Sequence, residues 1–184
     1  MNKSILIVGV GGQGTLLASR ILGNLMLQQG LDVKLSEVHG MAQRGGSVVT
    51  HVRYGEKVFS PMVDVGGADY VLAFERLEAL RAYPYLSGEG RMIVNNQEIF
   101  PMPVILQAAE YPEQVIDSER VQYVDALDLA NQAGSPKTVN VVLLGALAKR
   151  MDLPPENWKK AIRETVKPKF IEMNEKAFDL GYTY

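Results

Sequence analysis

The first candidate for a binding site in the sequence is a glycine cluster that follows an apolar stretch. Gly9, Gly11 and Gly14 have the spacing Gly-x-Gly-x-x-Gly, which is typical of the strand–helix turn in dinucleotide-binding folds. The N–H groups at the start of such a helix attract an anion or a polar group of a partner. We therefore predict cofactor contacts along this glycine turn, which comprises Gly9, Gly11, Gly12, Gln13 and Gly14. A tight turn that serves only backbone geometry and partner contact fits the same pattern.

A second candidate for binding is the polar loop between residues 39 and 47. It contains an arginine followed by two glycines, and a guanidinium in such a loop can hold a phosphate or a carboxylate through two parallel hydrogen bonds. A solvated or interfacial salt bridge of Arg44 is the alternative. The residues of this loop that we predict to bind a cofactor are Gln43, Arg44, Gly45 and Gly46.

Three further polar residues near this loop fit a structural role at least as well as a chemical one. Glu37 follows the glycine turn by about 20 residues, where a dinucleotide-binding fold places the acid that holds a ribose hydroxyl. A carboxylate that fixes the next loop is the alternative. His39 and His51 lack helical spacing and a neighbouring carboxylate pair, so we expect structural or interface histidines and no metal site. No residue is predicted to be catalytic, since the Gly-x-Ser-x-Gly turn of serine hydrolases is also absent.

The composition limits the classes of function. The chain has 184 residues, of which 47% are hydrophobic and 22% charged, as in an ordinary globular protein. Its net charge of −2 and the lack of a basic stretch argue against a nucleic-acid partner. No run is long enough for a membrane span, and the start of the chain indicates a first strand rather than a signal peptide, so we expect a cytoplasmic protein. Without cysteine the chain has no disulfide, no thiolate nucleophile and no thiolate ligand for an iron–sulfur cluster.

The elements that must position the glycine turn are expected to form one α/β domain over residues 1–184. Apolar and alternating patterns predict strands over 5–8, 32–38, 48–54, 68–74, 91–95 and 121–124. A first helix is predicted from about residue 13, and residues 58–59 are expected to pair back on the preceding strand as a short hairpin. These elements predict a Rossmann-like, doubly wound and mostly parallel sheet with a β-hairpin insertion and C-terminal helices.

The remaining helices are expected over 76–83, 113–120 and 127–133, followed by three more in the C-terminal third. Residues 97–112 contain three prolines, which predicts irregular structure with a short strand at 104–106. The segment 138–151 is apolar nearly all round, which predicts a buried helix interrupted at Asn140 and Gly145. Pro154-Pro155 and Pro168 are expected to open the last two helices.

Taken together, the two glycine-containing stretches resemble a known family. Residues 7–15 and 37–53 are similar to the gamma-type component of 2-oxoacid:ferredoxin oxidoreductases. Within that family, residues 39–46, which read His-Gly-Met-Ala-Gln-Arg-Gly-Gly, most resemble the small (beta) subunits of the indolepyruvate branch. Ala68-Asp69, Asn95, and Asn140 with Leu144-Gly145 also fit the family pattern, so the resemblance spans most of the chain.

The resemblance implies an enzyme that oxidatively decarboxylates an aryl 2-oxoacid, transfers the acyl group to coenzyme A and passes the electrons to ferredoxin. It implies that thiamine diphosphate and 4Fe-4S clusters belong to the large (alpha) subunit of an indolepyruvate ferredoxin oxidoreductase, which would be the partner of this chain. Coenzyme A would be a substrate of the complex, and the chain alone would be inert, with a homodimer as an open alternative for its isolated state. The lack of cysteine and of a Gly-Asp-Gly…Asn thiamine motif agrees with this division.

Two other classes of protein fit part of the sequence. A stand-alone NAD(P)-binding oxidoreductase is supported by the glycine motif and Glu37 alone, and the loop and strand after residue 38 count against it, because a helix is usual there. An adenylate-forming activating enzyme can carry a similar Gly-x-Gly-Gly-x-Gly loop, but it usually needs a cysteine or a zinc site. Binding of a nicotinamide cofactor by the chain alone would distinguish the first alternative.

Overall fold

The computed structural model describes residues 2–40 and 46–184, and a mixed sheet of six strands forms its centre. The strands lie in the order β2-β3-β1-β4-β5-β6. Neighbours from β1 to β6 run parallel, whereas β3 is antiparallel to both β1 and β2. Along the chain the strands are β1 (Lys3–Val10), β2 (Asp32–His39), β3 (Ser47–Gly55), β4 (Ala68–Ala73), β5 (Leu86–Asn95) and β6 (Val121–Val124). The predicted α/β class with its antiparallel insertion is confirmed.

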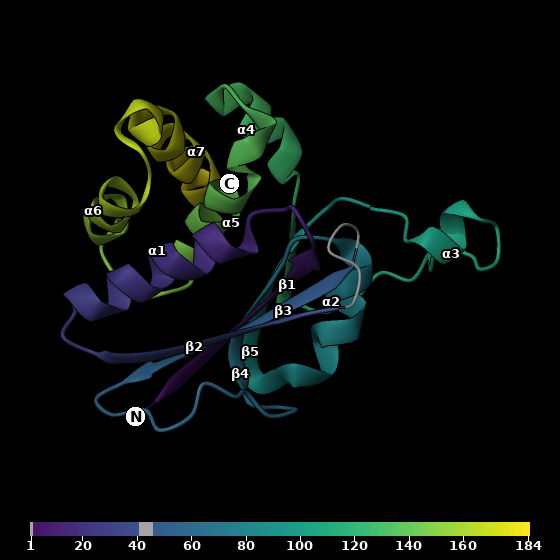
Figure 1. The fold of residues 1–184 in the computed structure, drawn as a ribbon, viewed down its shortest axis with the longest axis horizontal. Helices are drawn as coiled ribbons and strands as arrows, with labels where there is room; N and C mark the ends of the chain where they lie inside the picture. Colours follow the sequence, from purple (N-terminus) through teal and green to yellow (C-terminus); the bar gives the residue numbers. More distant parts are fainter. Residues whose placement is uncertain (1, 41–45) are drawn as a thin grey trace.

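Helices cover both faces of this sheet (Figure 1). One face carries α1 (Thr15–Gln28) and the C-terminal helices α4 (Ala126–Ala133), α5 (Val139–Ala148), α6 (Pro155–Thr165) and α7 (Ile171–Thr183). The other face carries α2 (Arg76–Ala82). The short α3 (Met102–Ile105) stands away from both layers on a projecting segment. Within the described part of the chain, no helix has the length and apolar character needed to cross a membrane.

The alternation of side chains along β1 explains why both layers form. Ile5 and Ile7 contact the larger apolar cluster, to which α1 and α5 contribute. Leu6 and Val8 point to the opposite face and contact the smaller cluster with α2. Successive side chains of a strand face opposite sides, so a strand that is apolar throughout must be covered twice. The central position of β1 in the sheet satisfies that requirement.

The helix α5 is buried along its whole length, as its composition predicts, but it is interrupted at neither Asn140 nor Gly145. Gly145 instead marks the point where α5 crosses α7. A Cβ atom added to Gly145 would collide with the carbonyl oxygen of Phe178, and one added to Gly181 would collide with that of Val142. The two glycines therefore let the helix backbones approach more closely than any side chain permits.

The short hairpin strand predicted at 58–59 is absent from the structure, which has no strand between Gly55 and Ala68. The reason lies in the sheet order, because β3 already pairs with β1 on one side and with β2 on the other. Neither edge of β3 is left for residues 58–59. The hairpin insertion is instead formed by β2 and β3 themselves.

Three predictions between Leu86 and Val121 differ from the structure. The strand predicted at 91–95 begins earlier, at Leu86, and Gly90 lets it approach the carbonyl oxygen of Ala68, which a Cβ would meet at 2.7 Å. The expected strand at 104–106 and helix at 113–120 are absent. Residues 102–105 form α3, which has Pro101 as its N-cap and Pro103 in its first turn, where a helix tolerates the missing N–H of proline.

Candidate functional site

The glycine turn lies at the C-terminal end of β1, beside the C-terminal end of the parallel strand β4. Its backbone needs glycine, since Gly12 and Gly14 have φ angles of +101° and +83°. At Gly9 a Cβ would meet Phe74 Cβ at 2.9 Å, and at Gly14 it would meet Asn140 Nδ2 at 2.8 Å. The turn therefore brings β1, β4 and α5 into close contact, at the edge where open α/β sheets bind ligands.

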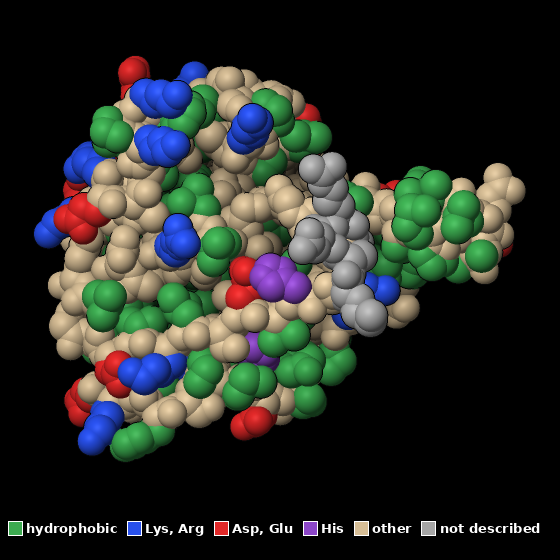
Figure 2. Space-filling model, viewed as in Figure 1, with side chains coloured by type: hydrophobic (Ala, Val, Ile, Leu, Met, Phe, Trp, Pro, Cys, Tyr) green, Lys and Arg blue, Asp and Glu red, His purple; other side chains and the backbone are tan. Residues whose placement is uncertain are grey.

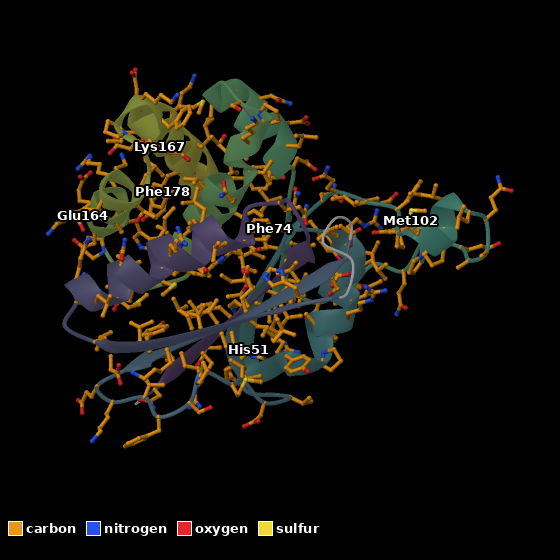
Figure 3. The ribbon with its side chains drawn as sticks, in the orientation of Figure 1. His51, Phe74, Met102, Glu164, Lys167 and Phe178 are labelled. Carbon is orange, nitrogen blue, oxygen red and sulfur yellow. The ribbon has the colours of Figure 1, made fainter. Side chains whose placement is uncertain are left out.

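Gln13 joins the ends of the two parallel strands. Its side-chain oxygen accepts a hydrogen bond from the backbone N–H of Val10 at 2.7 Å, and its Nε2 donates to the carbonyl oxygen of Phe74 at 2.8 Å. Asn95 Nδ2 donates to the same carbonyl at 3.1 Å. Phe74, labelled in Figure 3, thus follows β4 at the point where β1 and β5 are tied together. Gln13 shapes the turn, and through it any ligand site there.

The second candidate loop begins and ends next to this turn. The N–H of Gly11 donates to the carbonyl oxygen of Gly46 at 2.9 Å, and the N–H of Gly40 donates to that of Ser47 at the same distance. Gly46 is thereby placed beside the glycine turn, and its role in cofactor binding stays a prediction. Gln43, Arg44 and Gly45 lie outside the described residues, so their proposed roles stay predictions.

Glu37 lies on β2, paired with Thr50 of β3, rather than at the glycine turn. Its Oε2 accepts a hydrogen bond from Thr50 Oγ1 at 3.0 Å, and its Oε1 lies 2.7 Å from Nε2 of His39. These contacts match the alternative in which the carboxylate fixes the start of the following loop. Both of its oxygens have partners within the chain, and neither contact requires a ribose.

His51 has a structural role on β3. Its Nδ1 accepts a hydrogen bond from the backbone N–H of Val63 at 3.1 Å, on the face of the sheet opposite α1 (Figure 3). Burial lowers the pKa of His51 below its usual 6.5, because the charged ring would be desolvated. The expectation of a structural histidine is met at this position. Among the described residues, no group of three or more His, Asp or Glu side chains is arranged to hold a metal ion.

A pocket of about 520 Å³ opens between the glycine turn, the segment after β5 and the start of α5. The helix α1 points its N-terminus here, and its N-cap Gly14 supplies no side-chain acceptor for the first N–H groups. Lys137 adds a positive charge. Such a combination attracts a phosphate or carboxylate oxygen. The lining residues are Gly12, Gln13, Gly14, Leu17, Gln97, Ile99, Leu127, Pro136, Lys137, Val139 and Asn140.

An apolar pocket of about 580 Å³ adjoins the first one, since Leu17 and Lys137 line both. Phe170 and Met173 contribute apolar surface, and Lys167, labelled in Figure 3, adds a second cation at the rim. The two pockets form a trough that offers cations and helix N–H groups at one end and apolar walls at the other. A ligand with phosphates and a long, weakly polar chain matches both halves.

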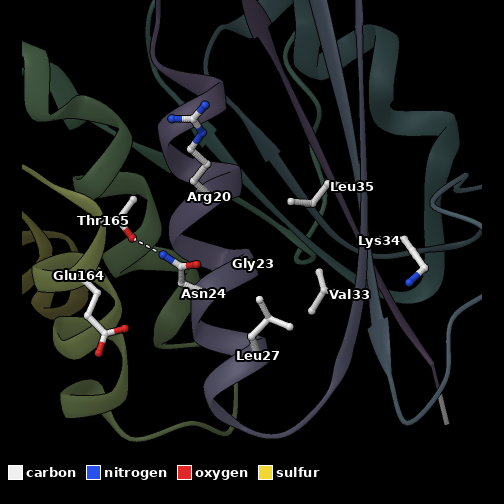
Figure 4. Close-up of a pocket in the computed structure, with 9 residues that line it drawn as sticks. All are labelled: Arg20, Gly23, Asn24, Leu27, Val33, Lys34, Leu35, Glu164 and Thr165. Atoms are coloured by element: carbon white, nitrogen blue, oxygen red, sulfur yellow. Dashed lines mark hydrogen bonds between the residues drawn. The ribbon is translucent and has the colours of Figure 1, made fainter.

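A third hollow, also of about 520 Å³, lies between α1, β2 and the end of α6. Figure 4 shows that Arg20, Lys34 and Glu164 point in different directions around it. A hydrogen bond of 2.8 Å between Asn24 Nδ2 and Thr165 Oγ1 joins α1 to α6 here. Because its charged groups do not converge, this hollow indicates helix packing rather than a ligand site.

The comparison with protein families decides the assignment. A family model described as pyruvate ferredoxin/flavodoxin oxidoreductase matches residues 4–184. The chain belongs to this family. The indolepyruvate oxidoreductase subunit IorB of Pyrococcus horikoshii is 43% identical, over 97% of this chain and 93% of that protein. The resemblance inferred from residues 7–15 and 37–53 is therefore confirmed, and the chain is a subunit of an oxidoreductase of this family.

Solved structures share the fold of this family member. The gamma subunit of a keto/oxoacid ferredoxin oxidoreductase from Geobacter sulfurreducens has a TM-score of 0.74 and 24% identity, and covers 98% of this chain and 96% of that one. A 2-oxoglutarate:ferredoxin oxidoreductase from Magnetococcus marinus has a TM-score of 0.77 and 18% identity, and the match covers 99% of this chain but 30% of that one. In the second protein the same fold is one part of a much longer chain.

Sequence analysis missed Gln97 and Lys137 as pocket residues. Asn140 was noted only as a family feature and a break in the helix, whereas it lines the pocket and its Nδ2 donates to the carbonyl oxygen of Gly14 at 3.3 Å. Two signals in the sequence point this way. Gln97 follows a strand that ends at the ligand edge of the sheet, and Lys137 lies in the polar stretch 135–138 directly before α5.

Proposed function

We propose that this chain is the small subunit of an indolepyruvate ferredoxin oxidoreductase. The observation that carries the proposal is the 43% identity to a subunit of that name over 97% of this chain. The complex would decarboxylate an aryl 2-oxoacid oxidatively, transfer the acyl group to coenzyme A and pass the electrons to ferredoxin. A cytoplasmic location, expected from the sequence, is part of the same proposal.

In this proposal the chain works with a large subunit. The sequence has no cysteine, so thiolate ligands for 4Fe-4S clusters must come from another chain. The match to the 2-oxoglutarate:ferredoxin oxidoreductase covers 30% of the matched chain, which leaves most of that chain without a counterpart here. Thiamine diphosphate and the clusters, bound by the large subunit, would supply the decarboxylation and electron-transfer chemistry.

For the glycine turn we propose contact with coenzyme A. The trough beside it fits this ligand, because Lys137, Lys167 and the N-terminus of α1 offer partners for phosphate oxygens and the apolar pocket offers a wall for the pantetheine chain. Gly12, Gly14 and Asn140 would hold the ligand end of the trough in shape. Gly9, Gly11 and Gln13 would act by positioning this turn.

The division of labour is tested by expressing the chain with and without its large subunit. We expect the complex to reduce ferredoxin or a viologen dye when given indolepyruvate and coenzyme A, and the isolated chain to be inactive. Dye reduction by the isolated chain would contradict the proposal. Reduction of NAD(P) by the chain alone would instead support the stand-alone oxidoreductase.

The ligand is tested by titrating the isolated chain with coenzyme A and, separately, with NADH in a calorimeter. We expect coenzyme A to bind and Lys137→Ala to weaken it, because each charge-assisted hydrogen bond contributes about 1.5–3 kcal/mol. Lys149→Ala, which changes an exposed lysine just after α5, is the matched control. Equal affinity of both variants would show that the trough is not the binding site.

A further inference from the structure

The arm between β5 and β6 reaches the trough only at its base, and the rest of it belongs to neither the glycine turn nor the trough. We define the arm as residues 98–115, and Figure 1 shows that it carries α3 away from the sheet and the helical layers. Apolar side chains gather on it (Figure 2). Its large apolar side chains that are 51–69% exposed are Phe100, Met102, Ile105, Leu106 and Val115. So dense a patch on one projecting segment marks an interaction surface.

The base of the arm is fastened to the body by one buried carboxylate. Glu75, which has no exposed surface, accepts hydrogen bonds from the N–H of Ile99 at 3.1 Å and from the hydroxyl of Tyr111. Ile99 lies on the outgoing side of the arm and Tyr111 on the returning side. Burying a carboxylate costs free energy unless its oxygens accept hydrogen bonds. The arm therefore supplies partners that Glu75 needs, and Glu75 holds both sides of the arm.

Further contacts at the base keep the arm extended. The hydroxyl of Tyr111 accepts a hydrogen bond from the N–H of Leu77 at 3.1 Å, and its ring lies 5.3 Å from that of Phe100. Beyond this base Met102 points into the open, far from Phe74 and the sheet (Figure 3). The fold thus fixes the arm at its base and presents its apolar tip, residues 102–106, outward.

We infer that the arm docks into an apolar groove, rimmed by lysine or arginine, on the large subunit of the complex. This inference rests on the proposed function. The arm contains Glu98, Glu110 and Glu113 and no lysine or arginine. Glu98 pairs with Arg76 at 2.5 Å, whereas Glu110 and Glu113 are exposed beside the apolar tip. A groove that covers the tip must also meet these carboxylates, and basic side chains at its rim would complement them.

The same charges disfavour a second copy of this chain as the occupant. A twofold dimer places the same patch of both subunits face to face. In such a dimer the two arms would bring their carboxylates close together, and the arm has no lysine or arginine to neutralise them. A partner with a different sequence avoids this conflict.

The position of the arm links docking to the ligand site. Gln97 and Ile99, at its base, line the pocket beside the glycine turn. Glu75 directly follows Phe74, whose carbonyl accepts the hydrogen bonds of Gln13 and Asn95. A large subunit seated on the arm would therefore lie next to the trough in which we place coenzyme A.

The test is a binding measurement between the purified large subunit and this chain, by calorimetry or biolayer interferometry. The triple variant Met102→Ser/Ile105→Ser/Leu106→Ser removes the apolar tip, and Glu110→Lys/Glu113→Lys reverses its charge. Loss of a central apolar anchor costs an interface about 2 kcal/mol, so we expect the dissociation constant of the triple variant to rise about 30-fold or more. The charge reversal should slow association, and this effect should fade in high salt.

Phe59→Ser is the matched control, since Phe59 is 84% exposed in the loop after β3 and lies outside the arm. It should leave binding unchanged, and all variants should keep the thermal midpoint of the wild-type chain, because the changed side chains are exposed. If the wild-type chain binds no large subunit, the proposed function fails. If it binds and the triple variant binds equally well, or if the triple variant abolishes instead a homodimer of the isolated chain, the large-subunit inference is wrong.

Discussion

Replacing Gln13 by leucine separates a positioning role of the glycine turn from a direct ligand role. The substitution keeps the size of the side chain and removes both of its hydrogen bonds, to the N–H of Val10 and to the carbonyl oxygen of Phe74. Phe74 keeps the bond from Asn95, whereas the N–H of Val10 loses the acceptor on Gln13. The two losses are therefore unequal.

The expected cost follows from these contacts. A buried N–H without a partner costs about 1–3 kcal/mol, and loss of one of two bonds to a carbonyl costs about 0.5–1.5 kcal/mol. The sum is about 1.5–4.5 kcal/mol, which in a domain of this size lowers the thermal midpoint by roughly 3–18 °C.

The assay is thermal unfolding of the isolated chain followed by circular dichroism. Gln132→Leu, on the exposed surface of α4, is the control for the same change of chemistry. Gln13→Glu adds a second check: it places a carboxylate oxygen against the carbonyl of Phe74, so it should destabilise the fold more at pH 7.5 than at pH 5. A midpoint for Gln13→Leu equal to that of Gln132→Leu would refute the positioning role.

Three other perturbations test separate parts of the structure. Gly181→Ala forces a Cβ against the carbonyl of Val142, and we expect it to lower the free energy of unfolding in urea by about 1–3 kcal/mol or more. Burial lowers the pKa of His51 in the folded state, so the unfolded chain takes up the proton first and the free energy of unfolding should fall as the pH drops below 6.5. His51→Gln should make this dependence of stability on pH weaker, measured by thermal unfolding between pH 5 and 8. Tyr111→Phe removes one hydrogen bond from buried Glu75 and should loosen the arm, so its amide hydrogens should exchange faster than in the wild type. Unchanged exchange would argue against Glu75 as the residue that holds the arm.

The sheet could be predicted well where strands carry a clear pattern. β1 and β4 are apolar and lie in the middle, and β3 alternates because one of its faces is fully buried and the other is largely only half-buried. The glycine turn was predicted at the correct end of β1 because strand, turn and helix signals follow one another there. Strand pairing was harder to predict. The turn at 55–57 favoured a short strand at 58–59, and only the order of the sheet shows that both edges of β3 are already paired.

The arm and the pocket could not be derived from local pattern alone. Residues 113–120 have helix-forming composition, but the N–H of Ile116 donates to the hydroxyl of Tyr123 on β6 rather than to a carbonyl of a helical turn. Gln97 and Lys137 meet at the pocket only because β5 and the turn before α5 end at the same edge of the sheet. Such convergence depends on tertiary contacts, which periodicity does not contain.

The close crossing of α5 and α7 has a consequence for the order in which the chain can fold. All ten residues of α5 are buried, and α7, which covers it through Gly181, follows it in the sequence after α6. During synthesis, the apolar surface of α5 therefore stays uncovered until α6 and α7 have also been made. The central strand β1 must likewise wait for β3 and β4, which follow it along the chain. A nascent chain of this kind exposes apolar segments before their partners exist, so its yield should depend on chaperones and on the rate at which α6 and α7 are translated.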